Sequence, residues 1–102
     1  MPASLQIIYP VSADSHFDYD YYLGTHMPLV DSHMGPHIDR VLVTKGIAGG
    51  PDVPPPYHLV ATIVFADQAA MKAALRASGP VNADVPNFTN VRPQVLIGEV
   101  IA

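Results

Sequence analysis

The chain has 102 residues, a formal net charge of −4 and no cysteine. This length fits one domain spanning residues 1–102. The five lysines and arginines are scattered along the chain, which argues against nucleic-acid binding and against attachment to an anionic membrane. The lack of cysteine excludes disulfides, thiolate metal sites and a cysteine nucleophile.

Only 14% of the residues are charged, whereas average usage is about 25%. We interpret this deficit as a sign that a partner subunit covers part of the surface; the alternative is that eleven prolines and seven glycines fill the loops instead. The N-terminus does not resemble a signal peptide, and no apolar run reaches the roughly 18 residues of a membrane-spanning helix. We therefore expect a cytoplasmic protein without membrane contact.

The first half of the chain predicts a strand, a helix and a second strand. Residues 4–9 alternate between apolar and polar side chains, which is typical of a strand. Residues 18–34 predict a helix with a kink or a restart at Pro28, and residues 37–47 predict the next strand. The apolar stripe expected on the helix consists of Leu23, Met27, Val30 and Met34.

The second half repeats this pattern after a proline-rich loop at 48–56. Residues 57–65 form the strongest predicted strand, apolar on both faces. Asp67 is expected to cap a helix over 68–78, which Gly79-Pro80 would end. A loop or short turn over 81–90 then leads to a last strand over 91–101.

The order β-α-β-β-α-β predicts a ferredoxin-like α+β fold, with a four-stranded antiparallel sheet and two helices on one face. The other sheet face is then left without a helix, although alternate residues of 57–65 are apolar on both sides. An exposed apolar face is unfavourable in water. We expect the sheet of a second subunit to cover it, which predicts a homodimer.

The five histidines are the main tunable proton carriers of the chain. His26 follows Tyr22 by four residues in the predicted helix, so both lie on one side. One interpretation makes His26 a general acid or base in a pocket whose wall includes Tyr22. In the other, His26 satisfies a carbonyl that Pro28 leaves free. No metal site is predicted, because nothing brings a third ligand near His26.

A polar segment over 84–90 precedes the last predicted strand. Asp84 either orients an imidazole or abstracts a proton, or it only forms an Asx turn. Three tyrosines cluster at the start of the first helix, Tyr19, Tyr21 and Tyr22. We interpret most of this cluster as packing, with one or two hydroxyls reaching a pocket.

The stretch from Phe17 to Val30 reads Phe-Asp-Tyr-Asp-Tyr-Tyr-Leu-Gly-Thr-His-Met-Pro-Leu-Val. It resembles the first-helix motif of EthD-type proteins, in which a Phe-Asp…Tyr-Tyr…His-x-Pro-Leu pattern follows the first strand. His26 matches the family histidine. The segments 87–90 and 98–100 also resemble the family, so the resemblance extends over nearly the whole chain.

This resemblance implies a dimeric α+β barrel, in which two sheets face each other and the helices lie outside. It implies no bound cofactor in most members, and an association with the degradation of ethers and aromatic compounds. Relatives of this barrel act on polyketide and quinol-type rings as monooxygenases, cyclases or isomerases. The chain itself has no nicotinamide or flavin fingerprint.

We therefore expect an enzyme without a tightly bound cofactor, of the oxidoreductase or isomerase type, acting on a small apolar, ether or aromatic molecule. The substrate would lie between the first helix and the sheet, with His26 as the proton carrier. The residues expected to contact it are Tyr22, Met27, Val30, Ile63, Phe65 and Asp84. The alternative is a non-catalytic binder or accessory protein for a hydrophobic metabolite. A second polar partner of His26 favours the enzyme, and a His26 that faces solvent favours the binder.

Overall fold

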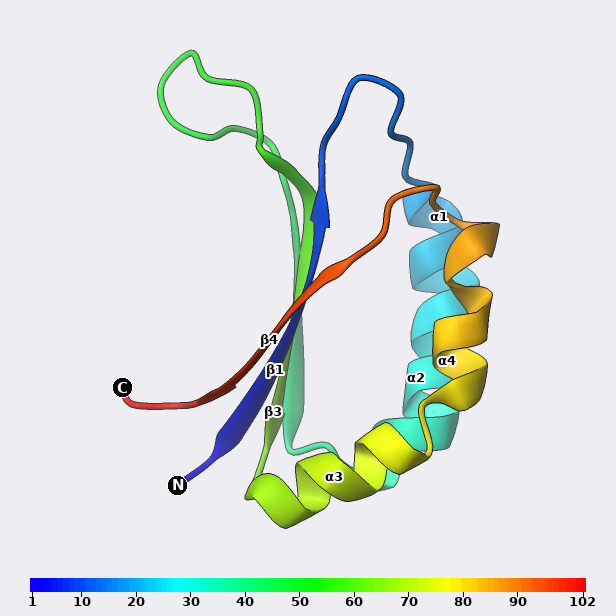
Figure 1. The fold of residues 1–102 in the computed structure, drawn as a ribbon, viewed down its shortest axis with the longest axis vertical. Coiled ribbons are helices and arrows are strands. Elements are labelled where there is room, and N and C mark those ends of the chain that lie inside the picture. The colour runs from blue at the N-terminus through cyan, green and yellow to red at the C-terminus, as the bar shows by residue number, and fades with distance from the viewer.

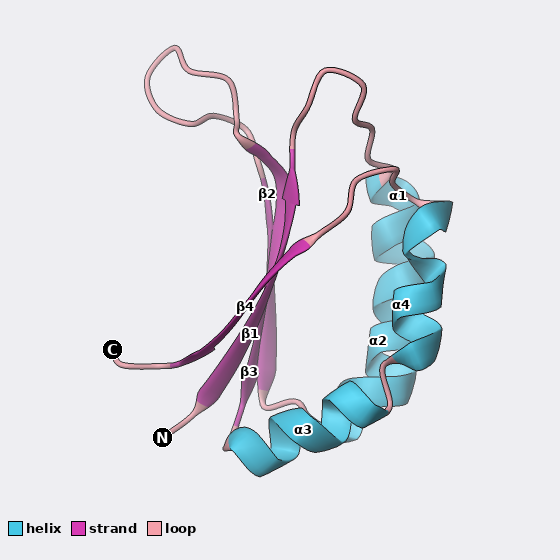
Figure 2. Ribbon diagram, in the orientation of Figure 1, coloured by secondary structure: helices cyan, strands magenta, loops and turns pink.

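The computed structural model describes residues 1–102 and contains one four-stranded antiparallel sheet in the order β2-β3-β1-β4. All helices lie on one side of this sheet (Figure 1; Figure 2). The strands are β1 (Ala3–Pro10), β2 (Arg40–Lys45), β3 (Tyr57–Phe65) and β4 (Gln94–Glu99). The helical elements are α1 (Tyr19–Tyr21), the π-helix η1 (Tyr22–His26), α2 (Met27–Met34), the 3-10 helix η2 (Gly35–His37), α3 (Gln68–Arg76), α4 (Gly79–Asp84) and the 3-10 helix η3 (Val85–Asn87). The predicted ferredoxin-like α+β class is confirmed.

The predicted strands are all present, and β3 has the bounds expected from the sequence. β2 and β4 are shorter than the predicted ranges 37–47 and 91–101. Asp67 caps α3 as expected, since its carboxylate accepts a hydrogen bond from the Ala70 N–H at 2.8 Å. No helix of the structure has the length and apolar character needed to cross a membrane.

The predicted loop over 81–90 is wrong, because α4 and η3 occupy most of it. The sequence suggests Gly79-Pro80 as the end of a helix, but Pro80 lies in the first turn of α4. Proline is favoured there, because the N–H that it lacks would have no partner within the helix. A further helix, α4, is therefore added to the two predicted ones, and it packs beside α2 (Figure 1).

The first helix contains a π-turn just before its proline. The Met27 N–H donates to the carbonyl of Tyr22, five residues earlier. Pro28 cannot donate to the carbonyl of Gly24, and in an α-helix its ring would clash with that carbonyl. The wider turn relieves this clash, so the predicted kink takes the form of a π-turn.

The π-turn changes which side chains of the first helix are buried. Leu23, expected in the apolar stripe, is 60% exposed. The extra residue of the turn rotates the preceding segment, so that the buried positions follow one another every four residues. They are Tyr22, His26, Val30 and Met34.

Two clusters of buried apolar side chains fill the space between sheet and helices. The larger cluster consists of Ala3, Leu5, Val30, Met34, Ile63, Phe65, Met71, Ala74 and Val81. The second, aromatic cluster consists of Tyr9, Tyr22, Leu59, Ala61 and Phe88. Met27 is half-buried and packs against both clusters. This division matters for the site, which lies beside the aromatic cluster.

The opposite sheet face carries no helix, as predicted (Figure 2). The strand register places its side chains in three rows: Arg40, Val64, Ser4 and Gly98; Leu42, Thr62, Gln6 and Leu96; Thr44, Val60, Ile8 and Gln94. Arg40 is the one side chain of these rows with a formal charge at neutral pH. At the centre, the Gln6 amide donates to the Thr62 hydroxyl at 3.1 Å. We call these three rows the open face.

Candidate functional site

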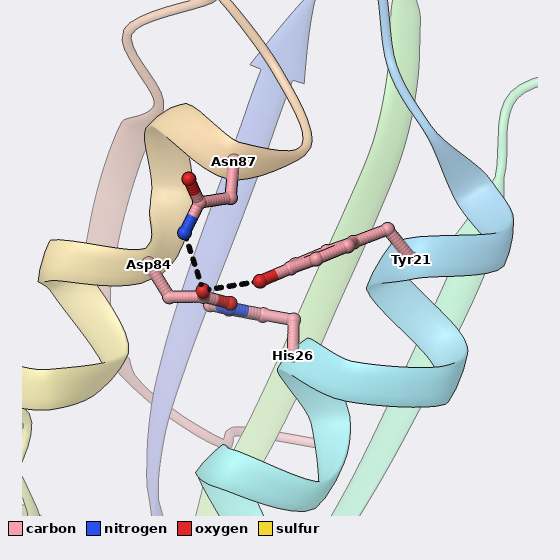
Figure 3. Close-up of polar contacts among 4 residues, drawn as sticks. All are labelled: Tyr21, His26, Asp84 and Asn87. Atoms are coloured by element: carbon pink, nitrogen blue, oxygen red, sulfur yellow. Dashed lines mark hydrogen bonds and ion pairs between the residues drawn. The ribbon is translucent and has the colours of Figure 1, made fainter.

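A histidine and an aspartate from distant parts of the chain meet between two helical segments. His26 is the last residue of η1, and Asp84 is the last residue of α4. Nδ1 of His26 lies 3.0 Å from Oδ2 of Asp84. The two residues are only 3% and 8% exposed. Figure 3 shows their side chains side by side. The sequence leaves two interpretations of Asp84, a partner of an imidazole and an Asx turn. In the structure its carboxylate contacts the imidazole of His26.

Two further side chains hold the carboxylate of Asp84. The Tyr21 hydroxyl donates to Oδ1 at 2.7 Å, and the Asn87 amide donates to the same oxygen at 3.0 Å. Figure 3 shows these donors converging on Asp84 from α1 and from η3, with His26 beside them. Asp84 thus accepts three hydrogen bonds, two on Oδ1 and one on Oδ2.

These contacts decide the charge states. Burial acts to raise the pKa of the Asp84 carboxyl, but the hydrogen bonds from Asn87, Tyr21 and His26 outweigh it and lower that pKa overall. Burial lowers the pKa of His26 more than its contact with Asp84 raises it. The hydrogen bond to Asp84 raises the pKa of the Tyr21 hydroxyl. At neutral pH the site therefore holds a carboxylate and a neutral imidazole.

The carboxylate also fixes the position of the imidazole proton. An ionised carboxylate only accepts hydrogen bonds, so Nδ1 of His26 must be the protonated nitrogen. Nε2 is then the basic nitrogen, and no protein group bonds to it. Every fully buried side-chain nitrogen or oxygen in the structure has a hydrogen-bond partner, so Nε2 is not fully buried. The lone pair of Nε2 is therefore used by no protein group.

Aromatic rings surround this base. The ring centre of Phe88 lies 4.5 Å from that of His26. The Tyr22 ring stacks on the imidazole of His26, with 5.1 Å between the two ring centres. Phe17 and Tyr9 continue the cluster around Tyr22 and Phe88. Burial raises the pKa of Tyr22 to about 12, so its hydroxyl stays protonated. These rings give the His26 imidazole an apolar surrounding.

The predicted contact residues are divided between the two buried clusters. Tyr22 lies in the aromatic cluster, next to His26 and Asp84. Val30, Ile63 and Phe65 lie in the larger cluster. Met27 stands between them and, with Val30, lines a cavity of about 240 Å³. The structure thus brings His26, Tyr22 and Asp84 together and sets Ile63 and Phe65 in the core; their roles in substrate binding stay predictions.

The largest cavity, about 690 Å³, lies on another surface of α4 and η3. It is lined by Asn82, Val85, Pro86, Thr89, Asn90, Val91, Arg92 and Pro93. None of the four cavities of the chain is lined by His26 or Asp84. Access to Nε2 therefore depends on movement of the surrounding rings or on surfaces beyond the single chain.

Tyr21 and Asn87 are not among the contact residues expected from the sequence. The sequence favours Tyr22 as the contact residue, because it precedes His26 by four residues and this spacing places side chains on one face of an α-helix. The π-turn changes that phase, so the hydroxyl of Tyr21 reaches Asp84 instead. Asn87 follows Asp84 by three residues, a spacing that signals contact only once α4 and η3 are known to be helical.

Another histidine makes a separate contact. Nε2 of His58 lies 2.8 Å from the Ser15 hydroxyl, which also bonds to Ser12 in the same turn. Burial, followed by the nearby charge of His16, lowers the pKa of His58. No group of three or more His, Asp or Glu side chains lies close enough to hold a metal ion.

Comparison with known proteins agrees with this architecture. The chain is similar over 99% of its length to an EthD-like protein from Ralstonia eutropha JMP134, with 27% identity, a TM-score of 0.89 and 93% of that chain covered. It is similar over 99% of its length to an ethyl tert-butyl ether D (EthD) family protein from Bacillus halodurans C-125, with 22% identity, a TM-score of 0.78 and 100% of that chain covered. SnoaB, a cofactor-independent oxygenase from Streptomyces nogalater, shares the fold, with 12% identity, a TM-score of 0.60 and coverage of 97% of this chain and 94% of its own.

No protein with a curated description matches the chain. The model of the EthD domain matches residues 12–92, which include the π-turn, the His26–Asp84 pair and the Tyr21 and Asn87 side chains that hold it. This chain belongs to the EthD domain family.

Proposed function

We propose that this protein is a small-molecule enzyme in which His26 removes a proton from an apolar substrate, without a tightly bound cofactor. The observation that carries the proposal is the buried pair itself, with Nδ1 bonded to Asp84 at 3.0 Å and Nε2 free. A neutral imidazole that is oriented by a carboxylate is a competent general base near neutral pH. His26 has one polar partner, Asp84, and its ring is buried and does not face solvent, which favours an enzyme over a passive binder.

The chemistry of the pair narrows the substrate class. A base at Nε2 acts only on a molecule with an acidic O–H or an activated C–H. A simple dialkyl ether has neither, whereas a phenol, a quinol or an anthrone-type ring does. The surrounding rings of Tyr22 and Phe88 suit a flat aromatic molecule. We therefore favour the aromatic member of the expected substrate range over the ether.

Deprotonation is a first step that oxygenation and isomerisation share. For an anthrone, Nε2 takes a proton from the activated ring carbon, and the resulting carbanion forms a C–O bond with O2. The proton returns from His26 to give a hydroperoxide, which loses water as its O–O bond breaks. The balance is one anthrone and one O2 to one anthraquinone and one water. The structural relative described as a cofactor-independent oxygenase supports this route.

The test uses anthrone as the probe, with two readouts. Deuterium exchange at the activated carbon reports proton transfer, and oxygen consumption reports oxidation. His26→Gln is expected to lower both by about 10²–10⁴-fold, the usual contribution of a general base. His16→Gln, at an exposed histidine, is the matched control and is expected to leave both unchanged.

Two results would overturn the proposal. One is an unchanged rate in His26→Gln. The other is tight binding of anthrone, measured by calorimetry, without exchange or oxidation by the wild-type protein; that result would make the protein a binder.

We further propose that the active unit is a homodimer in which the open faces of two copies meet. The open face has a single charged side chain, and its central Gln6 donates a hydrogen bond to Thr62 within the same face. Leu42 and Leu96 are 63% and 54% exposed there. Burying such apolar surface is the main driving force of association.

Sedimentation at micromolar concentration tests the dimer. Leu96→Lys is expected to shift the protein to a monomer, because it places a charge in the apolar interface. Leu23→Lys, at a similarly exposed leucine on the helical side, is the control and is expected to stay dimeric. A monomeric wild-type protein would contradict this part of the proposal.

A further inference from the structure

The two oxygens of the Asp84 carboxylate have different hydrogen-bond partners. Oδ1 accepts two hydrogen bonds, from Tyr21 at 2.7 Å and from Asn87 at 3.0 Å, while Oδ2 accepts only the one from His26. Neither Tyr21 nor Asn87 is bonded to Nε2, the atom to which we assign the proton transfer. Their hydrogen bonds act on the carboxylate alone.

We propose that Tyr21 and Asn87 are positioning residues, which hold the Asp84 carboxylate so that His26 is kept in the tautomer with its proton on Nδ1. This inference rests on the proposed function and deepens it. It assigns a role to a hydroxyl and an amide that lie outside the pair itself.

The first reason is geometric. A carboxylate turns about a single terminal torsion, which is broad and weakly restricted. Donors to Oδ1 from two different elements, α1 and η3, resist that rotation from both sides (Figure 3). With Oδ1 held, Oδ2 remains directed at Nδ1. If the carboxylate turned freely, the imidazole would lose its fixed partner.

The second reason is electrostatic. Two neutral donors on Oδ1 favour the ionised carboxyl without adding charge to the site. An ionised Asp84 accepts from Nδ1 and never donates to it, which excludes the tautomer with the proton on Nε2. A protonated Asp84 would instead be able to donate to Nδ1, and Nε2 would then lose its lone pair.

The π-turn is what places Tyr21 within reach. In an α-helix, residues five apart are separated by about 140° around the axis, since each residue turns the chain by about 100°. Tyr21 and His26 are five apart, yet both contact Asp84. The widened turn over η1 brings them to a common side. This local feature therefore recruits the hydroxyl that positions the partner of His26.

The test reads the His26 tautomer directly by long-range 1H–15N correlation spectra, without any substrate. We expect a single Nδ1–H form in the wild type. Tyr21→Phe removes only the hydroxyl, and Asn87→Asp replaces the donor by an acceptor of the same size. Both are expected to give a mixture of tautomers and about a tenfold lower rate of proton exchange at anthrone, the loss typical when a partner that orients a histidine is removed.

Two controls separate positioning from folding. Tyr57→Phe removes an exposed tyrosine hydroxyl that takes no part in the hydrogen bonds of the site and is expected to keep the Nδ1–H form. Thermal unfolding of each variant shows whether the fold is intact; Asn87 is exposed, so Asn87→Asp is expected to fold normally.

The tautomer of His26 and the rate of proton exchange test the two proposals separately. If Tyr21→Phe and Asn87→Asp keep a single Nδ1–H form, the positioning role is overturned, even when His26→Gln abolishes proton exchange. If they give mixed tautomers while His26→Gln leaves exchange unchanged, the positioning role holds and the proposed function fails.

Discussion

Asp84→Asn separates the charge of the carboxylate from its shape. The carboxylate accepts three hydrogen bonds, whereas an asparagine of the same size offers one acceptor oxygen and one amide donor. With its oxygen toward Tyr21 and Asn87, the new amide faces Nδ1 of His26. Nδ1 must then accept, so the imidazole proton moves to Nε2 and the base is lost.

The cost in stability is expected to be small compared with the cost in activity. Hydrogen bonds to a charged group contribute about 1.5–3 kcal/mol and neutral ones about 0.5–1.5 kcal/mol. Asp84→Asn weakens three such bonds but also removes the cost of burying a charge. We expect a net loss of about 1–2 kcal/mol in the free energy of unfolding. For a chain of this length, each kcal/mol lowers the Tm by about 4–8 °C.

The activity is expected to fall by about 10²–10⁴-fold, as for loss of the base itself. The assays are urea unfolding, deuterium exchange at anthrone and the 15N spectrum of His26. Asp39→Asn, at an exposed aspartate, serves as the control. An Asp84→Asn protein that keeps the Nδ1–H tautomer and the wild-type exchange rate would refute the reasoning, because the charge of the carboxylate would then be irrelevant.

Three further predictions concern the helix, the pH dependence and the aromatic cluster. Pro28→Ala restores an N–H for the Gly24 carbonyl, so we expect the π-turn to narrow and the Tyr21–Asp84 hydrogen bond to break; a crystal structure that retains the π-turn would contradict this. When the pH falls from 7 to values below 6.5, the ordinary pKa of histidine, the free energy of unfolding is expected to decrease, because the pKa of His26 is lowered and the unfolded chain then binds more protons than the folded one. The lowered pKa of Asp84 adds a further loss of stability below pH 3.8, the ordinary pKa of aspartate. In urea titrations at a series of pH values, His26→Gln should flatten the first of these two phases. Because His58 has a lowered pKa as well, His58→Gln is the required comparison, and an unaltered pH profile in His26→Gln would count against the assignment. Phe88 is only 1% exposed, so Phe88→Ala is expected to lower the free energy of unfolding, measured by chemical denaturation, by about 3–5 kcal/mol. Leu23→Ala should lower it far less, because Leu23 is 60% exposed. Equal losses in the two variants would contradict the rotation of the first helix.

The fold was largely predictable because its strands carry strong local signals. The alternation over residues 57–65 and the cap at Asp67 depend only on near neighbours in sequence, and both match the structure. The helix α4 was not predictable in the same way, since Gly79-Pro80 is compatible with the end of one helix and with the first turn of another. Only packing of Val81 against the core decides between these.

The site was predictable in its residue types but not in its pairings, and the π-turn explains the difference. Spacing in sequence translates into spatial proximity only at a known number of residues per turn. At α-helical phase, the partner of His26 on its own helix is Tyr22, and the two rings do stack at 5.1 Å. The hydroxyl that reaches Asp84 belongs instead to Tyr21, which the wider turn that Pro28 demands brings to that carboxylate. One missing backbone N–H therefore determines which tyrosine reaches the carboxylate. It follows that Pro28, although its side chain is exposed, shapes the site through its backbone.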